Sequence, residues 1–284
     1  MYFKTLRHSL KQYSRSITYC KAPIIIITSI LLDFILNFSS IDPVRNFAFP
    51  DLTERLLLFL ANVEWRDVGR EEGSGAVIKY IRSKQPNGTY PVCFPPILKH
   101  TVDGKEEVIN QLPAVLTYLG KLYNFLPDNA LDLARTLQIS LTALDALSGA
   151  EHAYHPINPR DGYANQVEAA KVTVATFLEN RLPVFLDMLE KALKMNNQGK
   201  GFYIGDTMTI ADLVVYNFMR GYRSSAKDHF NSNINIPTIK EFIQRMDSNE
   251  KIAAFLKSDR CTKMEDPNNT PLSKAPLVQV NSFM

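Results

Sequence analysis

The spacing of hydrophobic and polar positions divides the chain into two parts of different character. Between about residue 42 and residue 125, short strand-like stretches alternate with amphipathic stretches, and turns containing Pro or Gly separate them. Asp103 and Gly104 form a pair that is typical of a tight hairpin turn. The pattern predicts strands at 44–49, 64–68 and 108–109, and helices at 54–63, 75–83 and 113–123. Residues 94–99 contain two prolines that break any helix, and they lead into a further strand. This alternation predicts a small α/β domain.

After residue 127 the strand signals stop. Apolar residues recur at helical spacing in every later segment, and Pro183 interrupts the longest of them. The predicted helices are 130–152, 168–195, 210–222, 236–246 and 251–257. The second part of the chain is therefore expected to be all helical.

The strongest local signal in the second part is a helix start at Thr209. The Thr209 side chain can cap the backbone amides of the next turn, and Asp212, three residues later, can bond back to the Thr209 amide. Met208 and Leu213 are placed for the hydrophobic contact that often accompanies such a capping box. We expect this motif to start a buried helix and to take no part in chemistry.

Composition and charge exclude several classes of protein. Hydrophobic residues make up 45% of the 284 residues, so the chain can bury a core, which argues against a disordered or fibrous protein. The net charge is +3, but residues 1–21 contain five basic residues and no acidic one, so the rest of the chain sums to −2. The body of the protein therefore lacks the basic surface that binding to a nucleic-acid backbone requires.

An apolar run follows the basic N-terminus at residues 22–38, broken by Thr28, Ser29, Asp33 and Asn37. As a helix this run would be about 25 Å long, which is shorter than the roughly 30 Å hydrocarbon core of a membrane. Three interpretations stay open: a mitochondrial presequence, a signal anchor that contacts a membrane, or an extension with no fixed role.

Cysteine and histidine positions give little support for redox or metal chemistry. Cys20, Cys93 and Cys261 are far apart, and none belongs to a Cys-x-x-Cys pair, so we expect a reducing compartment and no disulfide framework. His152 and His155 stand close together without a further cluster of ligands, and we expect no metal site. The sequence has no glycine-rich phosphate-binding motif.

Four segments, taken in order, resemble the soluble glutathione transferases over roughly residues 42–260. They are Glu54-Arg55-Leu56-Leu57 with residues 63–68, Pro95-Pro96-Ile97-Leu98, Gln111 with residues 114–120, and the capping box after Tyr203-Ile204-Gly205-Asp206. Further stretches at 154–156, 179–183 and 252–256 resemble a bacterial and fungal branch of that family.

The resemblance implies an α/β thioredoxin-like N-terminal domain followed by an all-α C-terminal helical domain. The corresponding boundaries are an N-terminal extension at 1–41, a glutathione-binding domain at 42–125, a helical domain at 130–260 and a tail at 261–284. It also implies a homodimer that takes glutathione as co-substrate, uses no metal, and holds a small apolar electrophile between the two domains. The expected location is the cytoplasm, with mitochondrial or membrane-anchored placement as alternatives through residues 1–41.

The same resemblance assigns candidate site residues, three of which depart from the family pattern. The position at the end of the first strand that activates the thiol, counted back from Glu54, falls on Asn46, whose amide is a weaker donor than a hydroxyl. Ser39 and Ser40 lie just upstream and are the alternatives if the register is shifted. The cysteinyl backbone of glutathione is gripped by the residue before a cis-proline, and that proline corresponds to Pro96. The preceding residue here is Pro95, which has no N–H to donate.

Three further positions concern the γ-glutamyl end of glutathione. Gln111 is kept, whereas Leu112 stands where relatives have a hydroxyl residue that binds the carboxylate at a helix N-terminus. Asp145 corresponds to a residue that reaches the glutamyl amine in some relatives, and it also fits a solvated helix face. The leading function is conjugation of glutathione to a small apolar electrophile, and the alternative is a non-catalytic binding or protein-interaction module of the same fold.

Overall fold

The first part of the chain folds around a four-stranded sheet in the computed structural model, which describes residues 24–27, 51–83, 90–92, 95–158 and 163–261. The strand order is β2-β1-β3-β4, with β1 parallel to β2 and antiparallel to β3, and β3 antiparallel to β4. The strands are β1 (Ile24–Ile27), β2 (Trp65–Asp67), β3 (Ile97–Val102) and β4 (Lys105–Asn110).

The position of β1 corrects the predicted domain boundary. Ile24–Ile27 pairs with β2 on one side and β3 on the other, so this segment belongs to the domain and an extension ending at residue 41 is wrong. A strand inside a sheet that is covered on both faces consists of a continuous run of apolar residues. A leader sequence contains such a run as well, so the apolar pattern alone does not distinguish the two. The predicted strand at 44–49 lies outside the described residues.

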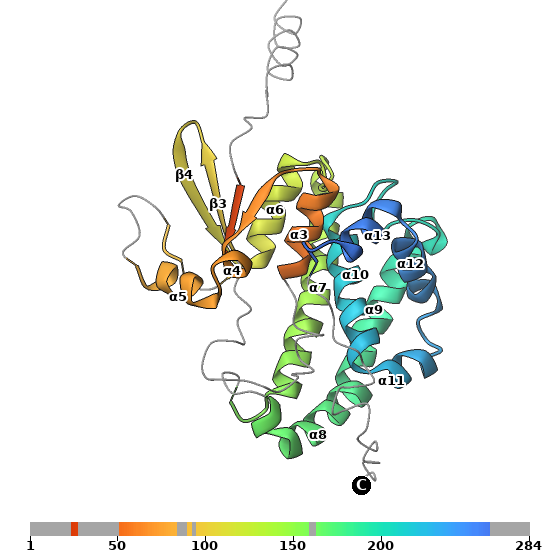
Figure 1. The fold of residues 1–284 in the computed structure, drawn as a ribbon. Helices are drawn as coiled ribbons and strands as arrows, with labels where there is room; N and C mark the ends of the chain where they lie inside the picture. The colour runs from red at the N-terminus through yellow and green to blue at the C-terminus, as the bar shows by residue number, and fades with distance from the viewer. Residues whose placement is uncertain (1–23, 28–50, 84–89, 93–94, 159–162, 262–284) are drawn as a thin grey trace, which may run out of the picture.

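Helices cover both faces of the sheet (Figure 1). Leu98 of β3 belongs to the core shared with α3 (Asp51–Leu60) and α6 (Leu112–Leu122), whereas its neighbour Ile97 packs in a smaller cluster with α5 (Ser74–Arg82). The short helix α4 (Val68–Glu71) joins β2 to α5. The predicted hairpin turn is confirmed, because Asp103 and Gly104 take φ values of 50° and 77° between β3 and β4.

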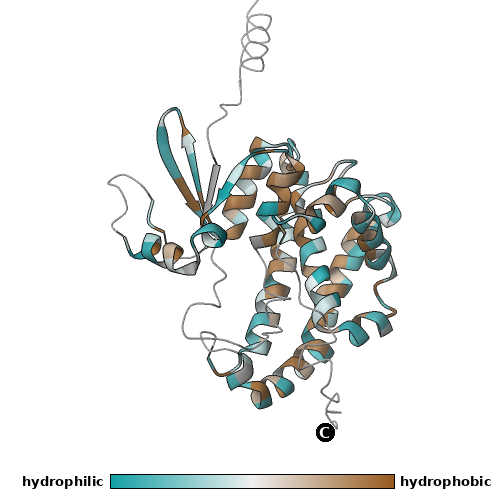
Figure 2. Cartoon of the chain, viewed as in Figure 1, coloured by the Kyte–Doolittle hydropathy of each residue, from teal (hydrophilic) through white to brown (hydrophobic). Residues whose placement is uncertain are grey.

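The remainder of the described chain is helical, as predicted. The helices are α7 (Ala130–Tyr154), α8 (Val167–Thr176), α9 (Leu182–Met195), α10 (Ile210–Ser225), α11 (Lys227–Ser232), α12 (Pro237–Asp247) and α13 (Glu250–Lys257). Hydrophobic positions alternate with polar ones around these helices (Figure 2). The architecture is therefore a thioredoxin-like domain followed by an all-helical domain.

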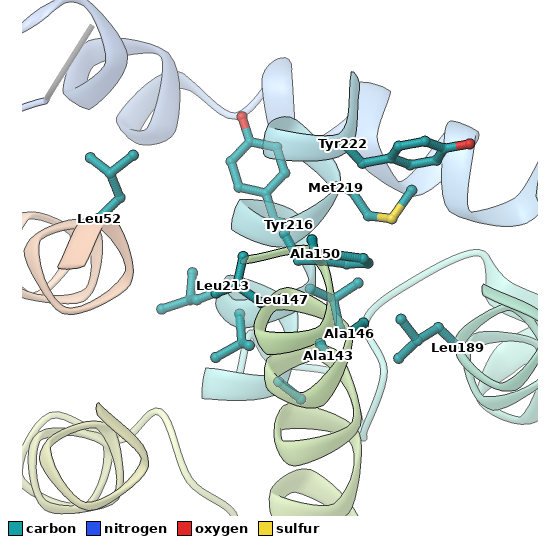
Figure 3. Packing of buried hydrophobic residues seen from close by; sticks show 14 of the residues in the cluster. Leu52, Ala143, Ala146, Leu147, Ala150, Leu189, Leu213, Tyr216, Met219 and Tyr222 are labelled. Atoms are coloured by element: carbon teal, nitrogen blue, oxygen red, sulfur yellow. The ribbon is translucent and has the colours of Figure 1, made fainter. Parts of the chain in front are cut away.

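Close packing of α7 against α10 forms the centre of the helical domain (Figure 3). Ala143, Ala146 and Ala150 are fully buried on α7, and their small side chains leave room for the larger Leu213 and Tyr216 of α10. The core is continuous between the domains, since the same cluster of buried residues contains residues of α3 and α6.

The predicted interruption of the long helix at Pro183 is confirmed. A π-helical turn at Phe177–Arg181 separates α8 from α9, and Pro183 occupies the first turn of α9. Proline lacks the N–H that the preceding helix would need, which explains why the α-helical pattern changes just before it.

The capping box at the start of α10 is confirmed and is fully buried. Asp212 accepts hydrogen bonds from the backbone N–H of Thr209 at 2.8 Å, from the Thr209 hydroxyl at 2.9 Å and from the backbone N–H of Tyr203 at 2.8 Å. Burial raises the pKa of Asp212 from 3.8 to about 6, against the opposing effect of these hydrogen bonds.

We expect this raised pKa to appear in the stability of the protein. A carboxyl that binds its proton more tightly in the folded state stabilises the fold below pH 4 and loses that contribution as pH rises through about 6. The stability difference between wild type and Asp212→Asn, which cannot titrate, should therefore shrink by about 1–3 kcal/mol between pH 4 and pH 7.5. Thermal unfolding at several pH values measures it, and a constant difference would contradict the assignment.

Candidate functional site

The structure brings two of the predicted glutathione-binding segments together at one end of the β3–β4 hairpin. The peptide bond between Pro95 and Pro96 is cis and comes directly before β3. Ile97 pairs with Asn110 across the two strands, and Gln111 and α6 follow Asn110 in the chain. The Pro95-Pro96 segment therefore lies beside the N-terminus of α6.

The start of α6 has the features of an anion-binding helix end. Gln111 is exposed and takes a φ of 74°, while the Leu112 side chain is buried in the core and anchors the first turn. No side chain caps this helix end among the described residues, and Pro113 stands in its first turn. The free backbone amides and the helix dipole favour a carboxylate at this point.

A part-buried hydrogen bond between β3 and α6, which the sequence did not indicate, connects these two segments. His100 of β3 is buried, and its Nδ1 lies 2.8 Å from the Tyr118 hydroxyl of α6. Burial lowers the pKa of His100 and raises that of Tyr118, so both side chains are held in their neutral forms. The bond ties the strand that follows the cis-proline to the helix that would bind the carboxylate.

Asn46, the predicted thiol activator, lies outside the described residues. The assignment of Asn46 depends on a first strand predicted at 44–49. In the structure the sheet contains Ile24–Ile27 as an inner strand, between β2 and β3. The residues that directly follow this strand in the sequence are Thr28 and Ser29, both with hydroxyl groups. The pattern of the sequence could have indicated them only if Ile24–Ile27 had been recognised as a strand.

Asp145 lies on the exposed side of α7. Among the described residues it makes no hydrogen bond or ion pair. Its exposure is compatible with both interpretations of this residue: a solvated charge, or a group that a second protomer would use.

Among the residues that the structure describes, no group of three or more His, Cys, Asp or Glu side chains is placed to hold a metal ion. None of the described helices has the length and apolar character needed to cross a membrane.

Comparisons with known proteins agree with this architecture. Residues 154–259 match the family model of the glutathione S-transferase C-terminal domain. Glutathione S-transferase Mu 6 of Mus musculus is 26% identical over 72% of this chain and 85% of its own length. S-crystallin 2 of Octopus vulgaris is 26% identical over 73% of this chain and 91% of its own.

Solved structures show the same fold. A sigma class GST of Fasciola hepatica superposes with a TM-score of 0.60 at 18% identity, covering 86% of this chain and 99% of its own. A maleylacetoacetate isomerase of Anaeromyxobacter dehalogenans, solved with glutathione in its active site, gives a TM-score of 0.51 at 16% identity, covering 90% and 99%. The predicted bacterial and fungal branch is not confirmed. The chain is therefore similar in sequence and fold to the cytosolic-type glutathione S-transferases, and its residues 154–259 match their C-terminal domain.

Proposed function

We propose that the protein is a glutathione transferase that joins the thiolate of glutathione to a small apolar electrophile, acting as a cytoplasmic homodimer. The observation that carries the proposal is the pairing of Ile97 with Asn110, which sets the Pro95-Pro96 segment beside the uncapped N-terminus of α6, within a glutathione transferase fold. In the reaction the sulfur attacks the electrophile, a carbon–sulfur bond forms, and the leaving group departs with its electron pair or the adduct takes up a proton.

Two segments of the first domain would position glutathione. Its γ-glutamyl carboxylate would accept hydrogen bonds from the backbone at Leu112 and from the Gln111 side chain. Its cysteinyl N–H would donate to the carbonyl of Pro95. Asp145 of the second protomer would bind the glutamyl amine across the dimer interface, which its exposed position on α7 permits.

Activation of the thiol requires a hydrogen-bond donor beside the sulfur atom. A free thiol has a pKa of about 8.5, so a hydrogen-bond donor must stabilise the thiolate near neutral pH. We assign this role to the Asn46 amide, with the hydroxyl of Ser29 as the competing donor because Ser29 follows the strand β1.

We expect Asn46→Ala to lower kcat by about tenfold or more while binding of glutathione is kept, because the lost donor acts on the thiolate. Ser29→Ala is the matched comparison, and it should keep most of the activity. Steady-state conjugation rates at saturating glutathione measure both variants. Full activity in Asn46→Ala together with a large loss in Ser29→Ala would transfer the role to Ser29.

A non-catalytic binding module is the second candidate. Two departures favour it: Pro95 cannot donate a backbone hydrogen bond, and Leu112 lacks the hydroxyl that would contribute about 1.5–3 kcal/mol toward a charged group. One relative is also named a crystallin and not a transferase. Retention on immobilised glutathione, followed by an assay with an aromatic halide, separates the candidates: retention with turnover supports the enzyme, and retention without turnover supports the binding module.

A further inference from the structure

Two arginines, one from each domain, join the end of the helical domain to the first domain by hydrogen bonds. Arg260, just after α13, donates from Nη1 to the backbone oxygen of Trp65 at 3.1 Å, and its guanidinium lies 4.7 Å from the centre of the Trp65 ring. Arg70 of α4 donates from Nη1 to the backbone oxygen of Arg260 at 2.8 Å. Each domain therefore supplies an arginine side chain to the backbone of the other.

Arg70 is connected to a buried carboxylate in the first domain, Asp67. Asp67 accepts a hydrogen bond from the backbone N–H of Arg70 at 3.2 Å, which caps α4, and pairs with Arg55 of α3 at 2.7 Å. Cys261, the residue after Arg260, is itself buried, so the chain stays packed against the protein at this point. Contacts of α13 with α3 place the whole segment against the first domain (Figure 1).

The part of the first domain that receives these contacts is weakly held by the sheet. β2 has three residues, and among the described strands it pairs with β1 alone. The indole N–H of Trp65 is buried and finds no acceptor in the described part of the structure. A buried donor without a partner gains a hydrogen bond to water when the region opens, so opening of this edge is less costly than opening of the core.

We propose that Arg70 and Arg260 form a clasp through which the helical domain keeps β2 and α4 packed against the rest of the protein. When the clasp is lost, this edge of the first domain unfolds locally as a separate unit. The proposal is independent of glutathione chemistry. The shared core of α3, α6 and α10 holds the two domains together without the clasp. Loss of the clasp is therefore expected to change the stability of this one edge and not the contact between the domains.

Trp65 makes the proposal directly measurable, since it is the single tryptophan of the sequence. In Arg260→Ala, tryptophan emission should shift to the red and quenching by acrylamide should increase at temperatures well below global unfolding. Amide exchange in residues 65–71 should become about tenfold faster, which corresponds to the hydrogen bonding lost, while exchange in α7 and α10 stays unchanged. Arg70→Ala removes the reciprocal bond and should shift exchange in the same direction.

Arg245→Ala is the matched control. Arg245 also donates to backbone oxygens, those of Gly199 and Gly201, and lies over the ring of Phe242, but within the helical domain. It should leave Trp65 emission and exchange of residues 65–71 unchanged. If Arg260→Ala and Arg70→Ala leave Trp65 as protected as in wild type, or if Arg245→Ala exposes it equally, the clasp is not what holds this edge and the proposal fails.

Discussion

Replacing Arg55 by alanine is expected to lower the free energy of unfolding by about 3–5 kcal/mol. Arg55 and Asp67 form an ion pair of 2.7 Å whose side chains are 1% and 5% exposed, and the pair joins α3 to the edge strand β2. Without the guanidinium, the Asp67 carboxylate stays buried without its opposite charge. The cost arises mainly from this uncompensated charge, since an intact buried pair contributes little net stability. Urea unfolding followed by circular dichroism measures the change.

An exposed arginine on the same strand provides the control. Arg66 pairs with Glu71 and Glu72, but these side chains are about half exposed, so Arg66→Ala should cost no more than about 1 kcal/mol. The double variant Arg55→Met with Asp67→Leu removes both charges and should recover part of the loss, although Asp67 also caps α4. A loss below 1 kcal/mol in Arg55→Ala would show that the pair does not hold β2 to α3.

The second large effect is expected at the start of α10, where Asp212→Ala should destabilise the protein by about 3 kcal/mol. The substitution leaves the backbone N–H groups of Thr209 and Tyr203 buried without their acceptor. Each buried amide left unsatisfied costs about 1–3 kcal/mol. The helix that starts here packs against α7 at the centre of the domain, so the loss is expected in the global transition.

Asp206→Ala is the control for this prediction, because Asp206 is an exposed acid in the same loop. It should change the free energy of unfolding by less than about 0.5 kcal/mol. Equal effects of the two substitutions would mean that the loss of an acidic side chain, and not the capping box, determines the stability of this region.

Local signals predicted much of the fold. The hairpin at Asp103 and Gly104, the capping box at Thr209 and the interruption before Pro183 each depend on a few neighbouring residues, and all three were predicted. The strand Ile24–Ile27 was missed, because four isoleucines define a strand only through partners that lie about 40 and 70 residues further along the chain.

The candidate site shows the same limit. Family motifs indicated Pro96 and Gln111, but nothing in the sequence placed them side by side; the pairing of Ile97 with Asn110 does that. The bond between His100 and Tyr118 and the arginine clasp around Trp65 are contacts between distant segments. Periodicity and local motifs do not encode such contacts, so they could not be predicted.

The pKa of the glutathione thiol when bound to the protein tests the proposed function most directly, because a transferase must hold this thiol as a thiolate. The measurement is an ultraviolet absorbance titration of the thiolate in the complex, with free glutathione as reference. We predict that the bound thiol titrates at least about one unit below the free value of roughly 8.5, and that Asn46→Ala moves it back toward that value. A bound thiol with the pKa of free glutathione would contradict the proposal of a transferase, and the non-catalytic binding module would be the remaining candidate.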